Sequence, residues 1–344
     1  MNDTNLNTDL NNSFKSNINI EQSMGFLNYL ELFLANTATK RVQGYGTIGL
    51  AHNTVRTYRS LHRIIKTFEK DSGLHLKLCS FNKNMAEDLT RYLKLDKQYS
   101  DNYTGQILKL LKVVLRDAQK GGHTIHPYSN YIEVFKQKKA ERIIHILSVD
   151  EIKKIKNLKG ISGKIKDSYN WLLIGLCMGQ RVSDLMSLTQ DNIRLAPRGL
   201  YVDIIQQKTK TAVTVGVSDP LVICIIKNEF PKRVSQVVFN RDIKLICKLA
   251  GVNQLVKGFK NNPKRRRKEL VVAPKFEFVT SHIMRRSFAS NYFGKIETPL
   301  LMNITGHSKE SNFLTYIGTH QNKDALADLF MKQLVGSGSL SIQL

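Results

Sequence analysis

The stretch from residue 280 to 318, TSHIMRRSFASNYFGKIETPLLMNITGHSKESNFLTYIG, constrains the fold of this chain more than any other segment. Thr298 and Pro299 have the form of a helix N-cap followed by proline at the first helical position. Gly306 is a helix stop, and Ser308 can cap the helix that follows it. The stretch therefore predicts three short helical pieces joined by tight turns, and side chains from such pieces can converge on one point.

Four side chains of this stretch suit chemistry at a phosphodiester. His282 and Arg285 are three residues apart, which places them on one face of a helix. His307 follows the next helical piece, and Tyr316 is predicted late in the last one, with Gly318 as its stop. Arginine matches phosphate in charge and geometry, histidine transfers protons near neutral pH, and a tyrosine hydroxyl can act as a nucleophile. Singly, each residue also fits a surface, turn or core role, so their joint occurrence carries the interpretation.

A net charge of +24, from 52 Lys and Arg against 28 Asp and Glu, limits the partners of the chain. A charge this large favours a polyanion, of which nucleic acid is the first candidate and an anionic membrane surface the second. No apolar run approaches the length of a membrane span. The four cysteines are scattered without a Cys-x-x-Cys pair, which predicts neither a zinc site nor disulfides and fits a reducing, cytoplasmic setting.

The hydrophobic pattern divides the 344 residues into two domains. Apolar residues recur at helical spacing over residues 21–70, 84–95 and 100–120, which predicts a bundle of about four helices. The Asn-rich start lacks the apolar core of a secretory signal. The predicted parts are a disordered tail over residues 1–20, a helical domain over 21–122, a linker over 123–147, a second domain over 148–335 and a flexible tail over 336–344.

The second domain opens on Ser148, which can form a capping box with Glu151. Residues 171–178 are continuously apolar and predict a buried helix. Arg181 follows closely, and an arginine in this place is costly unless it is paired or points at a ligand. Asp184, three residues later, is placed to orient it.

Strand patterning replaces helical patterning over residues 200–217, LYVDIIQQKTKTAVTVGV. Two β-rich runs flank QKTKT, which predicts a hairpin or small sheet. Lys208 and Lys210 are two residues apart and would share one face of a strand. Either lysine could reach a phosphate or a leaving oxygen, and two solvated turn lysines are the alternative interpretation.

Two basic segments each admit two interpretations. Four basic residues interrupt the apolar pattern of the helix predicted after residue 53, namely Arg56, Arg59, Arg63 and Lys66. They form either a solvated face or a contact with a DNA backbone. Residues 257–268, KGFKNNPKRRRK, carry seven basic groups and no acid. This run predicts a loop that is either solvated or in contact with a nucleic-acid backbone.

Residues 148–335 resemble the catalytic domain of the tyrosine recombinases, which are also called phage integrases. The resemblance rests on GQRVSDLMSLT, the lysine in QQKTKT, the His-x-x-Arg box in SHIMRRSFAS, and TGHSKESNFLTY, with the family's nine-residue step from His307 to Tyr316. The earlier helical region resembles the family's core-binding domain in helix pattern and position. The resemblance implies a mainly α fold with a small antiparallel β-sheet, in which a SAM-like helical bundle precedes a mixed α/β catalytic domain.

The resemblance assigns phosphate binding and nucleophilic attack to four residues. Arg181 and Arg285 would clamp the scissile phosphate, with Asp184 as the acidic residue behind the first arginine. His307 would hydrogen-bond the phosphate, and Tyr316 would be the nucleophile. TGHS stands where LGHS is commoner in the family, and this departure touches no catalytic group.

The resemblance assigns proton transfer to two more residues. Lys208 would be the general acid for the leaving 5′ oxygen. Lys210 is the alternative if the family's strand-turn lysine aligns with a later position in the turn. His282 would assist proton transfer.

The implied activity is that of a site-specific DNA recombinase, which cleaves and rejoins strands through a 3′-phosphotyrosine to integrate, excise or invert a DNA element. Bond energy is kept in this intermediate, so no metal, ATP or other cofactor is expected. The implied partners are double-stranded DNA, further copies in a homo-tetramer on two DNA sites, and accessory DNA-bending or directionality proteins, with no membrane. A type IB topoisomerase and a non-catalytic DNA-binding protein on the same fold are the rival interpretations.

Overall fold

A computed structural model describes residues 24–40, 48–135, 143–262 and 267–317, and the single positions 324, 327, 328, 330 and 331. Contacts divide the chain into two compact units, residues 1–138 and 139–344. The division falls inside the segment predicted as a linker. The predicted tails, residues 1–20 and 336–344, lie outside the described residues.

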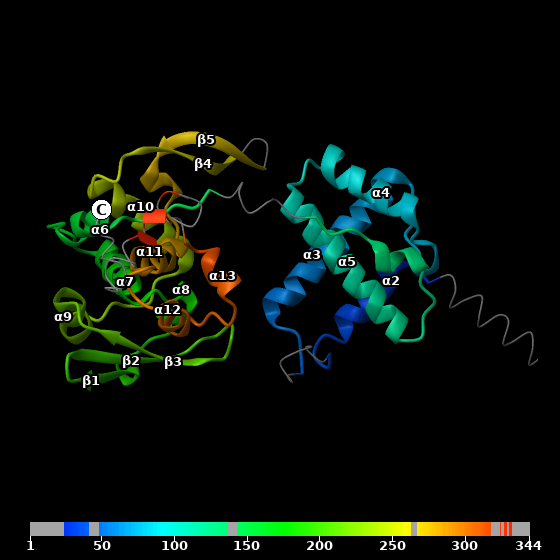
Figure 1. The fold of residues 1–344 in the computed structure, drawn as a ribbon. Coiled ribbons are helices and arrows are strands. Elements are labelled where there is room, and N and C mark those ends of the chain that lie inside the picture. Colours follow the sequence, from blue (N-terminus) through cyan, green and yellow to red (C-terminus); the bar gives the residue numbers. More distant parts are fainter. Residues whose placement is uncertain are drawn as a thin grey trace, which may run out of the picture. The chain divides into compact units, whose positions relative to one another are not determined.

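The first unit is a bundle of helices, as its apolar spacing predicts (Figure 1). Each helix turns one apolar stripe toward a shared core, in which Leu30, Leu61, Leu89 and Leu111 are fully buried. Its elements are α2 (Phe26–Ala35), α3 (His52–Ser72), a 3₁₀ turn (Leu78–Ser80), α4 (Lys83–Arg91), a π-helical turn (Tyr92–Asp96), α5 (Asp101–Lys120) and a second 3₁₀ turn (Pro127–Tyr131).

The chain that follows α5 packs with the first unit. Ile125 and Ile132 are buried in its core, one before and one after the second 3₁₀ turn. Gly105 of α5 lets this segment approach closely, because a Cβ there would lie 1.9 Å from the carbonyl oxygen of Phe135. Packing of the predicted linker against the bundle therefore extends at least to residue 135.

The second unit places helices between two small antiparallel sheets (Figure 1), which confirms the predicted fold class. The capping box of Ser148 and Glu151 is present at its first helix. Its elements are α6 (Val149–Lys156), α7 (Lys164–Met178), α8 (Val182–Leu185), β1 (Ile193–Ala196), β2 (Gly199–Ile205), β3 (Ala212–Val217), α9 (Pro220–Asn228), α10 (Gln236–Leu249), β4 (Leu255–Asn262), β5 (Arg267–Pro274), α11 (His282–Tyr292), α12 (Thr298–Thr305) and α13 (Glu310–Leu314).

Helix α7 lies at the centre of the second unit, because its continuously apolar residues are buried on all sides. It contacts α9, α10 and α11. Gly175 lets α7 cross α11 closely, since a Cβ at this position would lie 2.2 Å from the sulfur of Met284. This crossing brings the end of α7, and the arginine after it, beside the middle of α11.

The predicted hairpin is present as β2 and β3, paired from Leu200 opposite Val217 to Ile205 opposite Ala212. Alternate residues of both strands are buried, as expected for a sheet with one covered face. Lys208 and Lys210 lie in the turn, so the prediction that they share a face of a strand is wrong. Pairing stops before both lysines, and Lys210 has a positive φ of 58°.

The basic run over residues 257–268 is also not the predicted loop. Its described residues belong to β4 and β5, which pair from Leu255 opposite Pro274 to Asn262 opposite Arg267. Lys257 and Lys260 are exposed on β4, and Lys260 forms an ion pair with Glu277. A hairpin can keep such charges in water on its outer face while its inner face packs.

Two details of the C-terminal helices differ from the prediction. Helix α12 already includes Thr298, and its N-cap is Glu297. Helix α13 begins at Glu310 after an extended Lys309, so Ser308 does not cap it. The helix ends at Leu314, and Tyr316 lies in the turn after it instead of inside it.

Candidate active site

Arg181 is held at the start of α8 by contacts on two sides. Gly179 ends α7 with a φ of 66°, and a Cβ there would lie 2.4 Å from Phe288, so the turn requires glycine. The Arg181 Nη1 donates to Oε1 of Gln206 at 3.0 Å and lies 3.8 Å from the buried carboxylate of Asp184. The predicted pairing with Asp184 is therefore present, and the side chain of Arg181 remains 15% exposed.

Arg285 is a buried cation, with only 1% of its surface exposed. It donates from Nη1 to the carbonyl oxygen of Gly179 at 3.2 Å and from Nη2 to that of Thr305. Burial, followed by the charge of Arg181, lowers the pKa of Arg285 to about 10. No carboxylate lies within ion-pair distance of Arg285 among the described residues, and its polar contacts there are the two carbonyl oxygens and His307. Such a site favours an anionic ligand.

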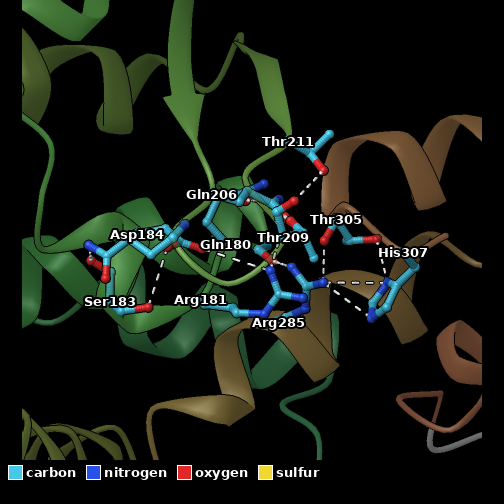
Figure 2. Close-up of polar contacts among 12 residues, drawn as sticks. Gln180, Arg181, Ser183, Asp184, Gln206, Thr209, Thr211, Arg285, Thr305 and His307 are labelled. Carbon is cyan, nitrogen blue, oxygen red and sulfur yellow. Dashed lines mark hydrogen bonds and ion pairs between the residues drawn. The ribbon is translucent and has the colours of Figure 1, made fainter. Parts of the chain in front are cut away.

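His307 lies against Arg285, with Nη2 of the arginine 3.2 Å from Nε2 of the ring (Figure 2). Its Nδ1 lies 2.8 Å from the hydroxyl of Thr305, which donates to the carbonyl oxygen of Leu301 at 2.6 Å. Thr305 and Arg285 therefore hold the imidazole of His307 in place from two sides. Burial, then the charges of Arg285, Arg181 and Lys208, lowers the pKa of His307 to about 3.

Tyr316 completes the contacts around Arg285. Its ring centroid lies 5.0 Å from that of His307 and 5.5 Å from the guanidinium carbon of Arg285. Phe313 and Ile317, on either side of it in sequence, are fully buried and anchor the turn. Within the described part of the chain, the hydroxyl of Tyr316 makes no hydrogen bond.

His282 and Lys208 face the same region from two other elements. His282 is the first residue of α11 and is exposed, and Lys208 is exposed at the tip of the β2–β3 turn. Loss of hydration, followed by the charges of Arg286, Arg285, Arg181 and Lys208, lowers the pKa of His282. The charge of Lys208 contributes to the lowered pKa of both histidines, and its turn contacts Arg181 through Gln206.

The structure thus brings all six predicted site residues to one region of the second unit, from five separate segments. The combination is two arginines and a lysine beside two histidines and a tyrosine. The model of the phage integrase family matches residues 133–323, more than half of the chain. The chain belongs to the phage integrase family. The model of the phage integrase SAM-like domain matches residues 25–138.

Solved structures of other phage integrases share this fold. The chain resembles a lambda integrase dimer bound to a COC' core site, with a TM-score of 0.62 and 17% identity over 90% of this chain and 82% of that chain. It resembles the Tn1549 transposon integrase in complex with transposon right end DNA, with a TM-score of 0.62 and 16% identity over 91% and 100%. A lambda integrase tetramer bound to a Holliday junction gives a TM-score of 0.60 and 17% identity over 87% and 82%. A search of the curated proteins found no match.

The described residues of this integrase include no group of three His, Cys, Asp or Glu side chains in an arrangement that could hold a metal ion. Within the same residues, no helix is long and apolar enough to cross a membrane.

Sequence reasoning passed over one arginine of this integrase. Arg286 is partly buried and lies one helical turn after His282, on the same side of α11. Burial lowers the pKa of Arg286, and Tyr316 opposes this shift. It makes no hydrogen bond or ion pair to any described residue. The signal was the doubled arginine in HIMRRSF, a second charge within a largely buried helix.

The lowered pKa of His307 predicts that acid destabilises the second unit. Between pH 6.5 and 3 the unfolded chain binds a proton at His307 that the folded chain excludes, so the free energy of unfolding falls as pH falls. A His307→Gln variant should lose less stability than the parent between pH 7 and pH 5. Urea unfolding at both pH values measures this, and equal losses in the two proteins would contradict it.

Proposed function

We propose that this protein is a site-specific DNA recombinase that cleaves and rejoins DNA strands through a 3′-phosphotyrosine. The observation that carries the proposal is the contact of Tyr316 and His307 with Arg285, a buried guanidinium that has no carboxylate partner among the described residues. A scissile phosphate supplies the missing anion and lies next to the nucleophile in this arrangement. Membership of the phage integrase family supports the same reaction.

In the first step of this reaction, the oxygen of Tyr316 attacks phosphorus and the bond to the 5′ oxygen breaks. Arg181 and Arg285 stabilise the charge that develops on the phosphate oxygens. His282, kept neutral by its lowered pKa, can take the proton of Tyr316, and Lys208 gives a proton to the leaving 5′ oxygen. Attack by a 5′ hydroxyl of another strand then reverses the bond changes and releases the tyrosine.

Double-stranded DNA is the proposed partner of both units. In the first unit, Arg56, Arg59, Arg63 and Lys66 are all exposed along α3 and make no ion pair to described residues. The three arginines of this set line an open hollow of about 510 Å³. This favours the DNA-backbone interpretation of the basic face over the solvated one. Assembly of four copies on two DNA sites and accessory bending proteins belong to the same proposal, which the similarity to a lambda integrase tetramer bound to a Holliday junction supports.

The proposed chemistry is tested by trapping the covalent adduct in EDTA. A duplex nicked close to its cleavage site loses the short strand after cleavage, so the phosphotyrosine cannot be reversed. The parent protein should give a DNA adduct on a denaturing gel, at the same rate with EDTA or magnesium, because the arginines supply the positive charge. An adduct that requires magnesium, or nicking without an adduct, would point to a metal-dependent nuclease or transposase.

The roles of the two turn lysines are separated by replacing the leaving 5′ oxygen with sulfur. Sulfur leaves without a proton, so a variant that lacks the general acid should cleave this substrate nearly as well as the parent. Lys208→Ala should slow cleavage of the normal strand by about 10²- to 10⁴-fold and recover on the sulfur strand.

Lys210→Ala is the matched control for this measurement, because Lys210 lies two residues from Lys208 in the same turn. It should lose some binding and show no selective recovery. If Lys210→Ala recovers cleavage on the sulfur strand and Lys208→Ala does not, Lys210 is the general acid and Lys208 acts in DNA binding. If neither variant recovers, both lysines act in DNA binding only, and His282 becomes the first candidate for the acid.

A further inference from the structure

Two buried glutamines, Gln180 and Gln206, lie between the proposed catalytic residues (Figure 2). Both side chains are 0% exposed, and they come from different segments: Gln180 follows α7, and Gln206 follows β2. The Nε2 of Gln206 donates to Oε1 of Gln180 at 3.0 Å. A buried amide pair of this kind persists only when its donors and acceptors are satisfied, which makes its other partners informative.

Gln206 links Arg181 to the turn that carries Lys208. Its Oε1 accepts from Nη1 of Arg181 and from the hydroxyl of Thr209, both at 3.0 Å. Its main-chain N–H donates to the carbonyl oxygen of Thr211 at 2.9 Å, and its carbonyl accepts from the N–H of Lys210 at 2.8 Å. One residue therefore closes the turn through its backbone and orients an arginine through its side chain.

Gln180 extends these contacts to the segment that carries His307. Its Nε2 donates to the carbonyl oxygen of Ile304 at 2.6 Å and to that of Met178 at 3.1 Å. Gly306 lies directly against Gln206, because a Cβ on this glycine would be 2.0 Å from Oε1 of the amide. The two amides thus touch the ends of α7, β2 and α12, which precede Arg181, Lys208 and His307 respectively.

We propose that Gln206, supported by Gln180, is a positioning residue that fixes Arg181 and the Lys208 turn in one arrangement, so that phosphate binding and protonation of the leaving oxygen occur together. This inference rests on the proposed recombinase function. An amide suits the role because it accepts a hydrogen bond from Arg181 without cancelling the arginine's charge, which stays available to the phosphate. A carboxylate in the same place would compete with the DNA for that charge.

The experiment compares Gln206→Leu with the parent on the oxygen and sulfur strands. The variant keeps side-chain volume and loses all three side-chain hydrogen bonds of Gln206. If Gln206 positions the Lys208 turn, cleavage of the oxygen strand should slow by about 10- to 100-fold. Cleavage of the sulfur strand should slow much less. The ratio of the sulfur-strand rate to the oxygen-strand rate should therefore rise, as it is expected to do in Lys208→Ala.

A purely structural role would slow both strands equally, through a smaller folded fraction, and an unchanged ratio would overturn the proposal. Gln207→Ala is the matched control, since it keeps the backbone bond to Asp184 and loses only an exposed side-chain hydrogen bond to the carbonyl of Ser183, and it should keep the parent's rates and ratio. Failure of the proposed function is recognised separately, because the parent would then form no adduct on either strand.

Gln206→Glu provides a second variant that preserves the shape of the side chain and its acceptor contacts. It places a negative charge beside Arg181 and an oxygen opposite Oε1 of Gln180, so adduct formation per folded molecule should slow at least about tenfold on both strands, with the folded fraction taken from thermal melting. Parent-like rates in a folded Gln206→Glu protein would overturn the claim that the amide preserves the charge of Arg181.

Discussion

Tyr316→Phe should abolish the covalent DNA adduct and leave DNA binding intact. The phenyl ring keeps its contacts with Arg285 and His307, so the geometry around the arginine is preserved and only the nucleophilic oxygen is lost. We expect a loss of at least about 10⁴-fold in adduct formation, since removal of a covalent nucleophile costs on the order of 10⁶-fold in a well-characterised hydrolase. The nicked-duplex assay measures the adduct, and a gel-shift assay measures binding.

Tyr292→Phe is the control for this substitution, because Tyr292 is a partly exposed tyrosine on α11 of the same unit. It should form adduct at the rate of the parent. Adduct from Tyr316→Phe would show that another residue is the nucleophile. Loss of adduct in both variants would show an effect of folding and not of chemistry.

Arg285→Lys should be nearly inactive despite conserving the charge. Arg285 binds two carbonyl oxygens, those of Gly179 and Thr305, while it also contacts His307. A lysine ammonium is a point charge that cannot satisfy these groups and a phosphate from one position. We expect adduct formation to slow on the order of 10³-fold, as when oriented donors are removed from other active sites.

The same substitution on the surface, Arg194→Lys, is the control, because Arg194 forms an exposed ion pair with Asp203 on the small sheet. It should change neither rate nor stability measurably. Arg285→Lys should also lower the melting temperature of the protein, since a buried carbonyl group loses its donor. A rate within tenfold of the parent would mean that only the charge of Arg285 matters, and the proposed clamp would be wrong.

Local signals in the sequence predicted most of the elements that carry the site. The capping box at Ser148 and the glycine that ends α12, Gly306, mark helix ends that the structure confirms. Alternating apolar residues predicted β2 and β3 in the same way. These signals act within a few residues, because caps, turns and periodicity depend on neighbouring dihedral angles and on one buried face.

Local signals failed where side-chain charge and backbone pairing gave opposite indications. The run over residues 257–268 is too basic to resemble a strand, yet its described residues all lie in the paired strands β4 and β5. The two-residue spacing of Lys208 and Lys210 is typical of one face of a strand, yet the pairing of β2 with β3 ends before it reaches them. Strand pairing is decided by a second segment, so the pattern of one segment does not determine where it stops.

The sequence by itself determined the family, the two helical and mixed α/β parts of the chain, and the identity of the six proposed site residues through their motifs. Only the tertiary structure decided how those residues meet. Arg285 is buried against carbonyl groups that are 106 and 20 residues away, and Gln206 reaches Gln180 across 26 residues. A buried cation or amide is stable only when distant segments supply its hydrogen-bond partners, and sequence spacing carries no record of which segments those are.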